Sequence, residues 1–582
     1  MPRTRCLTGL FISVVTMLAG CTPTEWFRRT SDKVDMPTAP KLPELKTVGD
    51  YTSFFGLEPI RVNGVGVVVG LKGTGSNPPP GPMRQQALRD LKRYGVDAPD
   101  DLLKSGDVAV VGVTAYIPAG IRRDDRLDIE VELMPADKAT SLKGGQLLPC
   151  DLHEWVDANQ ATGRGQDGAR PMKHNKLAKA EGTVVVGLGE GGGKDERVRR
   201  GRVWGGGSIM KDRGFELVLG RNNQSAGLAV AIAKALNDRF HSADGTGTRV
   251  VAEAMTNARV VITVPDTYRL NWPRYLRVLR EIPIGPSTQF SRALAEQLCR
   301  ELEDPKQAVH AALQLEALGK DSIPQLKRGL QAPGPLSRFC AAEALAYLGD
   351  PASAEPLAEL VRANPEFRAY GLTALASLDE AVCHLKLREL LHCTSPETRY
   401  GAFRALRMLN ENDAHIRGEQ MEGGFWLHRL PSQAPGLVHV TTSQRPEVVI
   451  FGEEPVFTPP FSLRAGSDFI LTAKEGDDQC IVSRYSTQSG RSQQVCSLKA
   501  TAIITSLGNL GASYGDVVDL LQQAATCHSL SGAFAIDALP QAHALAVEGV
   551  GEADATPAKA DLGDTPNLFA RMGRLFEHGD KR

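Results

Sequence analysis

The chain has 582 residues, too many for a single hydrophobic core, so we expect about two to four domains. Its 67 lysines and arginines almost cancel its 68 aspartates and glutamates, which excludes the basic character that non-specific nucleic-acid binding requires. Aromatic residues make up only 6% while glycines number 58, which favours thin sheets and tight turns over a bulky catalytic interior.

The N-terminus has the features of an export signal. Two arginines precede a short apolar run at 7–18, and small residues follow it. This run is too short to span a membrane, so we predict a signal peptide at residues 1–20. A polar, proline-containing tether is expected at 21–48.

The end of the signal, Leu18-Ala19-Gly20-Cys21, resembles a bacterial lipobox. The resemblance implies cleavage before Cys21, lipidation of its thiol and, because Thr22 follows in place of Asp, retention at the outer membrane. The alternative is an ordinary cleaved signal that contains Cys21 as a buried cysteine.

The stretch from Arg61 to Leu148 predicts a mixed α+β module. Valines and glycines alternate from Val65 to Gly70, so one face of this strand carries branched side chains and the other is half bare, which permits close approach of another backbone. An amphipathic helix at Met83–Tyr94 ends at Gly95, and strands are expected at 107–117 and 126–133.

Four blocks of this stretch resemble, in order, the flagellar basal-body P-ring protein family. The blocks are Asn63–Gly75, Gln85–Leu91, Ala109–Ala115 and Asp137–Gly145. The resemblance implies a closed periplasmic ring around the flagellar rod, beneath an outer-membrane L ring, that acts as a bushing and catalyses no reaction. Ring closure also fits the behaviour of head-to-tail interfaces.

The resemblance continues into a strand–helix–strand unit, with strands at 182–188, 215–219 and 259–264 and a helix at 225–240. Residues 155–181 lack periodicity, and we expect a loop there.

From about 304 to 412 the composition shifts to Ala, Leu and Arg. Leu318-Gly319, Leu348-Gly349, Leu378-Asp379 and Leu409-Asn410 recur every 30 to 31 residues, each at the end of an apolar helix. This period predicts stacked helical hairpins that resemble short HEAT-like repeats. They are absent from ordinary P-ring proteins and serve either as a protein-binding surface or as a spacer that widens the ring.

After the repeats, a hairpin at 437–452 and a strand at 461–466 resemble the family's later block. A helix is expected after Ser513, which forms a capping box with Asp516. A linker then leads to a short amphipathic helix beginning at Pro566, which docks on its own body or on a neighbour.

The predicted fold class is therefore α+β, with small mixed ring-building modules (strand–helix–strand) interrupted by an all-α HEAT-like solenoid. The predicted segments are 1–20 signal peptide, 21–48 tether, 49–290 P-ring-like α+β modules, 297–412 helical repeats, 430–545 C-terminal P-ring-like β/α module, and 546–582 linker and helix.

Export would place the cysteines in an oxidising compartment. Cys480 and Cys496 flank a polar stretch between two strand-like runs, so a hairpin disulfide is a candidate. Cysteines 299, 340 and 383 lie on apolar helix faces, where buried thiols are common.

The sequence contains no complete catalytic or cofactor-binding motif. The stretch 187–194 lacks the first Gly and the Ser or Thr of a phosphate loop, and no HExxH or CxxC spacing supports a metal site; Cys150 with His153 is an isolated pair. Ser513, with Asp537 and His543 downstream, imitates a hydrolase nucleophile elbow, but helix capping explains Ser513 as well. We predict no catalytic residue, cofactor or metal.

The sequence thus favours a lipid-anchored periplasmic structural subunit of a flagellar P-ring-like assembly. By resemblance its partners are further copies of itself, the rod, L-ring proteins, the outer membrane and peptidoglycan, with a separate protein partner for the repeats and no nucleic acid. Candidate subunit or rod contacts are Lys72, Thr74, Lys138 and Lys143. The alternative is a non-flagellar outer-membrane lipoprotein scaffold that binds proteins through the repeats.

Overall fold

The computed structural model describes residues 45–135, 137–156, 172–188, 194–240, 242–243, 248–285, 288–486, 490–542, 545–547 and 558–569. The predicted signal peptide, most of the predicted tether and Cys21 lie outside these ranges. Residues 45–48 belong to the folded part: Thr47 bridges to Pro283, and Val48 is fully buried at the start of α1 (Val48–Tyr51).

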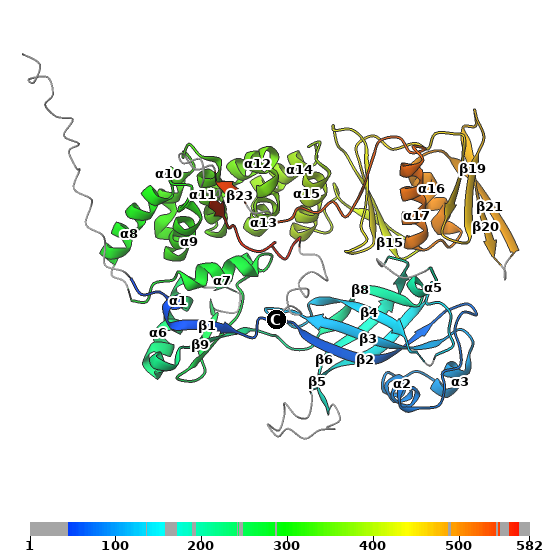
Figure 1. Ribbon diagram of the computed structural model, residues 1–582, viewed down its shortest axis with the longest axis horizontal. Coiled ribbons are helices and arrows are strands. Elements are labelled where there is room, and N and C mark those ends of the chain that lie inside the picture. The colour runs from blue at the N-terminus through cyan, green and yellow to red at the C-terminus, as the bar shows by residue number, and fades with distance from the viewer. Residues whose placement is uncertain are drawn as a thin grey trace, which may run out of the picture. The chain divides into compact units, whose positions relative to one another are not determined.

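A closed antiparallel barrel dominates the first half of the chain (Figure 1). Its six strands follow the order β4-β3-β2-β5-β6-β8, and β4 pairs with β8 to close the ring. The strands are β2 (Ile60–Val69), β3 (Ala109–Ile117), β4 (Arg126–Leu133), β5 (Gln146–Val156), β6 (Met172–Thr183) and β8 (Arg200–Ile209), with α5 (Lys194–Arg197) and the short β7 (Val185–Val186) beside β8.

The predicted two-sided character of β2 is confirmed. Val67 packs outward against α2 (Pro82–Arg93) and α3 (Pro99–Lys104), whereas Val62 and Val68 point into the barrel core. The glycines of β2 lie on the face that points into the barrel, where there is no room for a side chain at these positions. A Cβ on Gly64 would lie 2.5 Å from the backbone oxygen of Asp151. Glycine therefore lets β5 approach β2 closely.

The loop prediction for 155–181 is wrong for the part that the structure describes. Trp155 and Val156 end β5, and residues 172–181 belong to β6. The register between these strands shifts at three places, near Leu147, Leu152 and His153, and such bulges break the two-residue alternation by which strands are recognised.

A second, smaller sheet has the order β1-β9-β13-β12. Helix α6 packs on β12 and β13, and Ser225 caps it by accepting a hydrogen bond from the Leu228 amide at 3.1 Å. The elements are β1 (Thr52–Phe55), β9 (Phe215–Leu219), α6 (Ala226–Arg239), the pair β10 (Ser242–Ala243) and β11 (Thr248–Arg249), β12 (Ala252–Ala254), β13 (Arg259–Ile262) and α7 (Trp272–Arg280).

Eight helices follow as a stack of antiparallel pairs. Successive contacts join α9, α11, α13 and α15 into an inner row, which α8, α10, α12 and α14 flank. The four recurring dipeptides lie at the C-terminal ends of the inner helices, and residues 319, 349 and 379 take left-handed conformations there. The helices are α8 (Thr288–Glu301), α9 (Ala308–Leu318), α10 (Ile323–Gly329), α11 (Pro335–Tyr347), α12 (Ala354–Ala363), α13 (Arg368–Leu378), α14 (Ala381–Leu390) and α15 (Pro396–Leu409).

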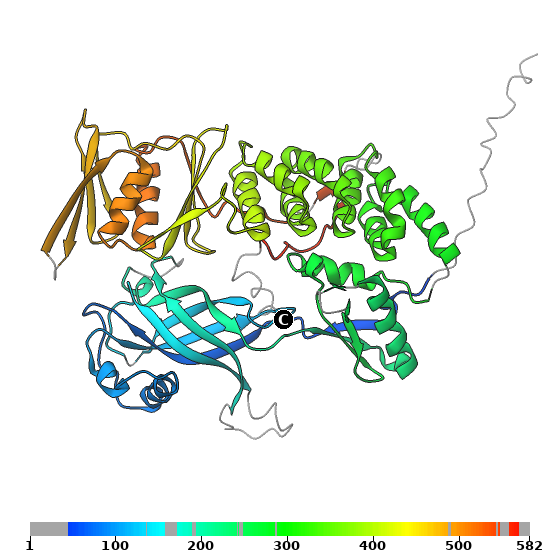
Figure 2. The same ribbon diagram turned by 180° about the vertical axis from the view of Figure 1, so that it is seen from behind.

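The C-terminal module packs two helices between two sheets, as Figures 1 and 2 show. One sheet has the order β14-β15-β17-β16-β22 and contains the predicted hairpin as β16–β17; the other is the meander β18-β19-β20-β21. The elements are β14 (Gly418–Met421), β15 (Phe425–Leu430), β16 (Leu437–Val440), β17 (Glu447–Phe451), β18 (Phe461–Ala465), β19 (Phe469–Ala473), β20 (Gln479–Ser486), β21 (Gly490–Ser497), α16 (Ala500–Asn509), α17 (Tyr514–Thr526) and β22 (Ala533–Ile536).

The α+β class is confirmed, and the strand–helix–strand unit expected at 215–264 is present as β9, α6 and β13. The module before it is a barrel, which the strand–helix–strand description does not cover. Among the described residues, the strands before the helical stack and those after it share no sheet. None of the helices in the described ranges combines the length and apolarity needed to cross a bilayer. The short pair β23 (Leu545–Val547) and β24 (Ala558–Ala560) ends the described secondary structure, and residues 567–569 form a turn in place of the predicted helix start.

Candidate interaction site at one end of the barrel

Two of the four sequence blocks meet at one end of the barrel. The loop after β2 contains Lys72 and Thr74, and the loop before β5 contains residues 137–145. Thr74 joins them: its hydroxyl donates to Leu71 O at 2.8 Å and to Ser141 O at 2.9 Å, and its carbonyl accepts from the Thr140 amide at 2.8 Å. We call this pair of loops the motif loops.

Asp137 accepts the hydrogen bonds that hold the motif loops in place. Its side chain is buried and accepts hydrogen bonds from the amides of Val110 (3.2 Å) and Ala139 (2.8 Å) and from the Ser76 hydroxyl. A buried carboxylate is stable when its oxygens are matched by donors in this way. Asp137 therefore fixes both loops to the start of β3.

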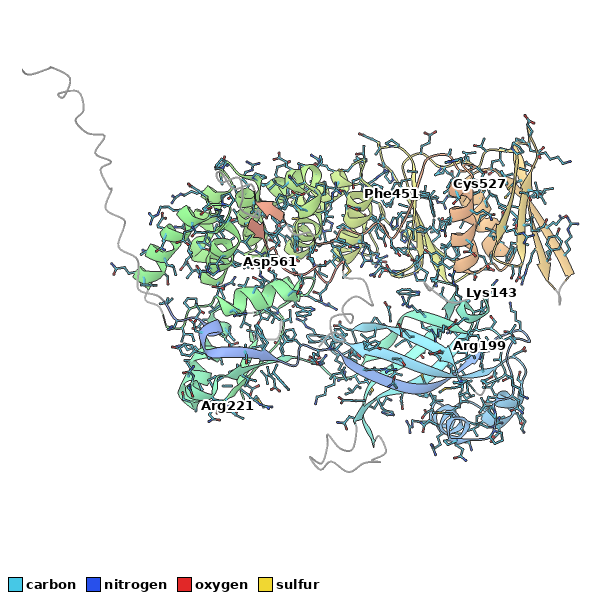
Figure 3. All side chains as sticks on the ribbon, viewed as in Figure 1. Lys143, Arg199, Arg221, Phe451, Cys527 and Asp561 are labelled. Carbon is cyan, nitrogen blue, oxygen red and sulfur yellow. The ribbon has the colours of Figure 1, made fainter. Side chains whose placement is uncertain are left out.

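Two residues outside the blocks complete this scaffold. Asp107 accepts from the Gly73 amide at 2.5 Å, and the Arg199 guanidinium donates to Ala139 O at 2.8 Å. Figure 3 labels Arg199 together with Lys143. Sequence reasoning gave neither residue a role in this site: Asp107 stood only as the first residue of the strand expected at 107–117, and Arg199 belongs to no motif and reaches the loops through the closed barrel.

The four predicted contact residues differ in accessibility. Lys72, at a left-handed turn position, and Lys138 are exposed, whereas Thr74 is partly buried. Lys143 is engaged within the chain: its ammonium lies 3.0 Å from Asp516 Oδ2 and 3.6 Å from Asp468 Oδ2. Lys72 and Lys138 are therefore the two predicted residues whose side chains face solvent at the motif loops.

The hydrolase-like Ser513 has a structural role. Its amide and its hydroxyl both donate to Asp516 Oδ2, at 2.8 and 2.7 Å, which is the predicted capping box of α17. Asp537 accepts from the Thr442 amide and hydroxyl instead of serving a triad. His543 lies outside the described residues.

The isolated Cys150 and His153 do not form a ligand pair. Cys150 points into the barrel core, where burial raises the pKa of its thiol to about 12, and residues three apart in a strand lie on opposite faces. Within the described ranges, no group of three or more His, Cys, Asp or Glu residues is placed to hold a metal ion.

Cys480 and Cys496 face each other across β20 and β21 in direct register, with their sulfur atoms 3.5 Å apart. The predicted pairing of these strands is confirmed; both cysteines are free thiols in the structure, and the disulfide itself stays a prediction.

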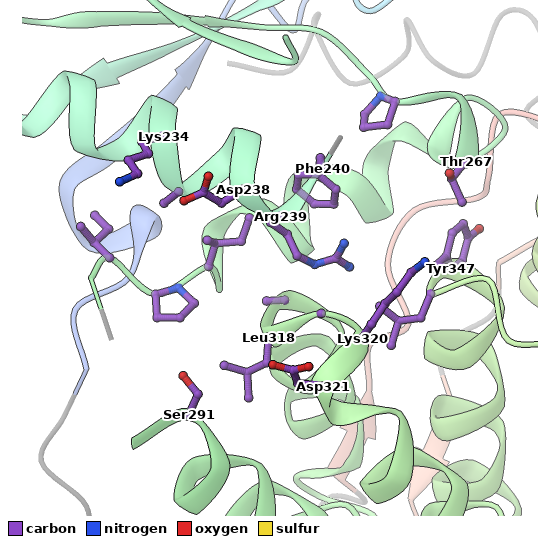
Figure 4. A pocket seen from close by; sticks show the side chains of 18 of the residues that line it. Lys234, Asp238, Arg239, Phe240, Thr267, Ser291, Leu318, Lys320, Asp321 and Tyr347 are labelled. Atoms are coloured by element: carbon purple, nitrogen blue, oxygen red, sulfur yellow. The ribbon is translucent and has the colours of Figure 1, made fainter. Parts of the chain in front are cut away.

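A cavity of about 830 Å³ lies between α6 and the C-terminal ends of α9 and α11 (Figure 4). Its charged lining mixes signs, since Lys234 and Asp238 come from α6 and Lys320 and Asp321 from the segment after α9. Arg239 at its edge is already engaged, since its guanidinium donates to Glu316 O at 2.9 and 2.6 Å. This lining is not selective for one ligand charge.

The described residues therefore define an α+β assembly of a barrel, two sheet modules and a helical stack, in which braced loops, not reactive groups, are the distinctive features. Residues 47–296 match the family model of the flagellar P-ring protein. This match supports, over that region, the resemblance given by the four blocks.

Curated relatives agree with the family match. The flagellar P-ring protein of Caulobacter vibrioides is 33% identical over 206 residues, covering 33% of this chain and 50% of that protein. Those of Fervidobacterium nodosum and Geobacter metallireducens are 30% and 27% identical, covering 41% and 45% of this chain and 66% and 67% of theirs. The chain thus spans about half to two thirds of the length of these relatives, whose family is structural and non-enzymatic.

Proposed function

We propose that the chain is a structural subunit of a periplasmic flagellar P-ring-like assembly that surrounds and supports the rotating rod. The family match over residues 47–296 carries this proposal. The braced motif loops support it, because a bearing surface must keep its shape under load, and Asp137, Thr74 and Arg199 hold these loops with buried or partly buried hydrogen bonds.

In this proposal the mature chain is lipidated at Cys21 and held at the outer membrane. Copies associate into a ring, and L-ring proteins and peptidoglycan are further partners. Lys72 and Lys138 contact the rod or a neighbouring copy, because both residues are exposed on loops held by buried hydrogen bonds.

Deleting the gene and imaging basal bodies in the envelope tests the proposal. We expect the loss of a ring and of swimming, with recovery on expression of the wild-type chain. A Lys72→Ala/Lys138→Ala double variant should assemble or swim poorly while its purified form melts at the wild-type temperature. Intact rings and normal motility in the deletion strain would exclude the flagellar role.

Lipidation needs a separate test. Metabolic labelling with a radioactive fatty acid should mark the wild-type chain and leave a Cys21→Ser variant unlabelled. Equal labelling of both would exclude lipidation at Cys21. The proposed role as a ring subunit would be unaffected.

The helical stack favours a second candidate, because it lies almost wholly beyond the matched region. In this alternative the chain is a non-flagellar outer-membrane scaffold whose HEAT-like repeats bind proteins. Affinity purification of the full chain from cross-linked cells separates the two, since rod and L-ring components identify the flagellar assembly and their absence beside other envelope proteins identifies the scaffold.

A further inference from the structure

The inner face of the helical stack is covered by the chain's own C-terminal segment. After β22 the chain returns along the stack, and residues 558–569 lie between α7 and the inner helices, as both views show (Figures 1 and 2). Leu562, Leu568 and Phe569 are only 6%, 4% and 1% exposed. These three side chains therefore anchor the segment in the core.

Side chains of the stack and of α7 bind the main chain of this segment. Tyr370 on α13 donates its hydroxyl to Gly563 O, Arg277 on α7 donates to Asp561 O at 3.0 Å, and Arg404 on α15 donates to Leu568 O at 2.7 Å. Recognition of backbone carbonyls, with pockets for a few apolar side chains, is how domains bind extended peptides.

Arg404 has binding capacity beyond the Leu568 carbonyl. The residue is 8% exposed, and its Nε and Nη1 atoms find no hydrogen-bond partner among the described residues. Burying a guanidinium with unmatched donors is costly, so further acceptors are favoured beside the Leu–Phe pair.

The segment is attached to the rest of the fold by few elements. Its strand β24 pairs with β23 and, within the described ranges, joins no larger sheet. Among the described residues, its other contacts include the buried side chains of Leu562, Pro566, Leu568 and Phe569 and polar bonds such as Trp272 N to Asn567 Oδ1 at 3.2 Å.

We propose that the surface of α7, α13 and α15 that contacts residues 558–569 is a peptide-binding site, and that these residues are its resident, exchangeable ligand. The ligand class is an extended peptide with a leucine followed six positions later by Leu–Phe. The proposal is independent of the flagellar assignment, because it rests on contacts inside this chain.

The test uses the full chain with a specific protease site inserted at residues 549–556, so that cleavage frees the segment without removing it. A fluorescent peptide of residues 558–582 is then added, and its anisotropy is measured. Three buried apolar side chains predict exchange with a dissociation constant on the order of micromolar. The uncut chain should bind at least tenfold more weakly, because a tethered segment has an effective concentration on the order of millimolar.

Two matched peptides and one variant of the binding surface distinguish specific exchange from non-specific binding. A Leu568→Ser/Phe569→Ser peptide should bind the cut chain at least tenfold more weakly, whereas an Asp564→Ser peptide, changed at an exposed position, should bind normally. A Tyr370→Phe chain, which keeps the ring and loses one donor, should bind several-fold more weakly with unchanged circular dichroism. Failure of the cut chain to exchange, or equal binding by all peptides, would overturn the proposal.

Discussion

Cys480 and Cys496 lie opposite each other in an antiparallel pair, where the Cβ atoms are close enough for a disulfide. A hydrogen bond with Cys480 lowers the pKa of the Cys496 thiol to about 7, and the same bond raises that of Cys480. Cys496 is therefore the thiol that reacts first with an oxidising disulfide near neutral pH.

We expect oxidised glutathione to convert this pair into an intramolecular disulfide, with two protons and two electrons passing to the oxidant. Intact-mass measurement of the alkylated protein checks this, because the bridged chain resists alkylation at two cysteines. Closing a loop of this size should stabilise the C-terminal module by about 3 kcal/mol. Oxidation should not stabilise a Cys496→Ser chain. If oxidation stabilised this variant as much as the wild-type chain, the Cys480–Cys496 disulfide would not be the cause.

His439 is a buried neutral group at the junction between α15 and the β16 strand. Its ring stacks on Tyr400 with centroids 3.7 Å apart, and its Nε2 accepts from the Ala538 amide at 3.0 Å. Burial lowers the pKa of His439 to about 3, although Glu447 and Asp537 oppose this by favouring the charged form.

This pKa predicts a pH dependence of stability. Between about pH 6.5 and pH 3 the unfolded chain binds a proton at His439 that the folded chain does not, so the free energy of unfolding falls as the pH falls, by up to ~1.4 kcal/mol per pH unit. Urea titrations at several pH values give the free energy of unfolding as a function of pH. This free energy should change less steeply with pH in His439→Gln than in the wild-type chain. His310→Gln, at an exposed position, should keep the wild-type slope; equal slopes in all three proteins would exclude His439 as the cause.

Among the elements, β2 depends most strictly on its sequence. A Cβ at Gly64 meets the backbone oxygen of Asp151 at 2.5 Å, whereas one at Gly112 on the neighbouring β3 has no neighbour closer than 3.6 Å. Gly64→Ala should therefore destabilise the barrel by about 1–3 kcal/mol. Gly112→Ala is the matched control, and thermal melts of the two variants measure the difference; equal melting temperatures would show that β5 yields to the added methyl group.

Strands with one buried face were predicted almost to the residue, as at 126–133 and 215–219, because alternation directly reports burial. The recurring Leu-Gly and Leu-Asp pairs likewise located the ends of the inner helices. Strand β6 was missed because register shifts interrupt its alternation. Barrel closure was also beyond the sequence, since the Arg126–Ser208 pairing joins strands that no local pattern connects.

At the candidate site, too, local sequence patterns could be recognised but tertiary contacts could not. The motif loops could be proposed from their residues, but the partner of Lys143 could not, because Asp516 lies 373 positions away in another module. Exposure of Lys72 and engagement of Lys143 look identical in sequence. Only the tertiary fold distinguishes the exposed Lys72 from the half-buried Lys143 beside Asp516.

At the scale of the molecule, one hydrophobic core joins the small sheet, α6, α7 and the helical stack, while the barrel has a core of its own. Within this core, Arg274 on α7 forms ion pairs with two helices of the stack. Its guanidinium lies 2.6 Å from Glu316 on α9 and 2.6 Å from Glu343 on α11. All three side chains are at least nine-tenths buried.

We therefore expect the small sheet and the stack to unfold in one transition, separate from that of the barrel. Arg274→Met leaves two buried carboxylates without their cation and should lower the stability of that transition by about 3–5 kcal/mol. Arg328→Met, which removes the solvent-exposed pair with Glu296, should leave the stability of that transition nearly unchanged. Calorimetry measures both, and a barrel transition that shifts equally would contradict the separation of the two cores.

The circular arrangement of the six barrel strands also limits how copies of the chain can join. Each of these strands already has a neighbour on both sides, so none presents a free row of amides and carbonyls to another molecule. Among the described residues, strand-to-strand contact between copies is then left to the outermost strands of the sheets, such as β1, β12, β14, β21 or the two-residue β7, and the six closed strands meet a neighbour through their side chains and connecting loops.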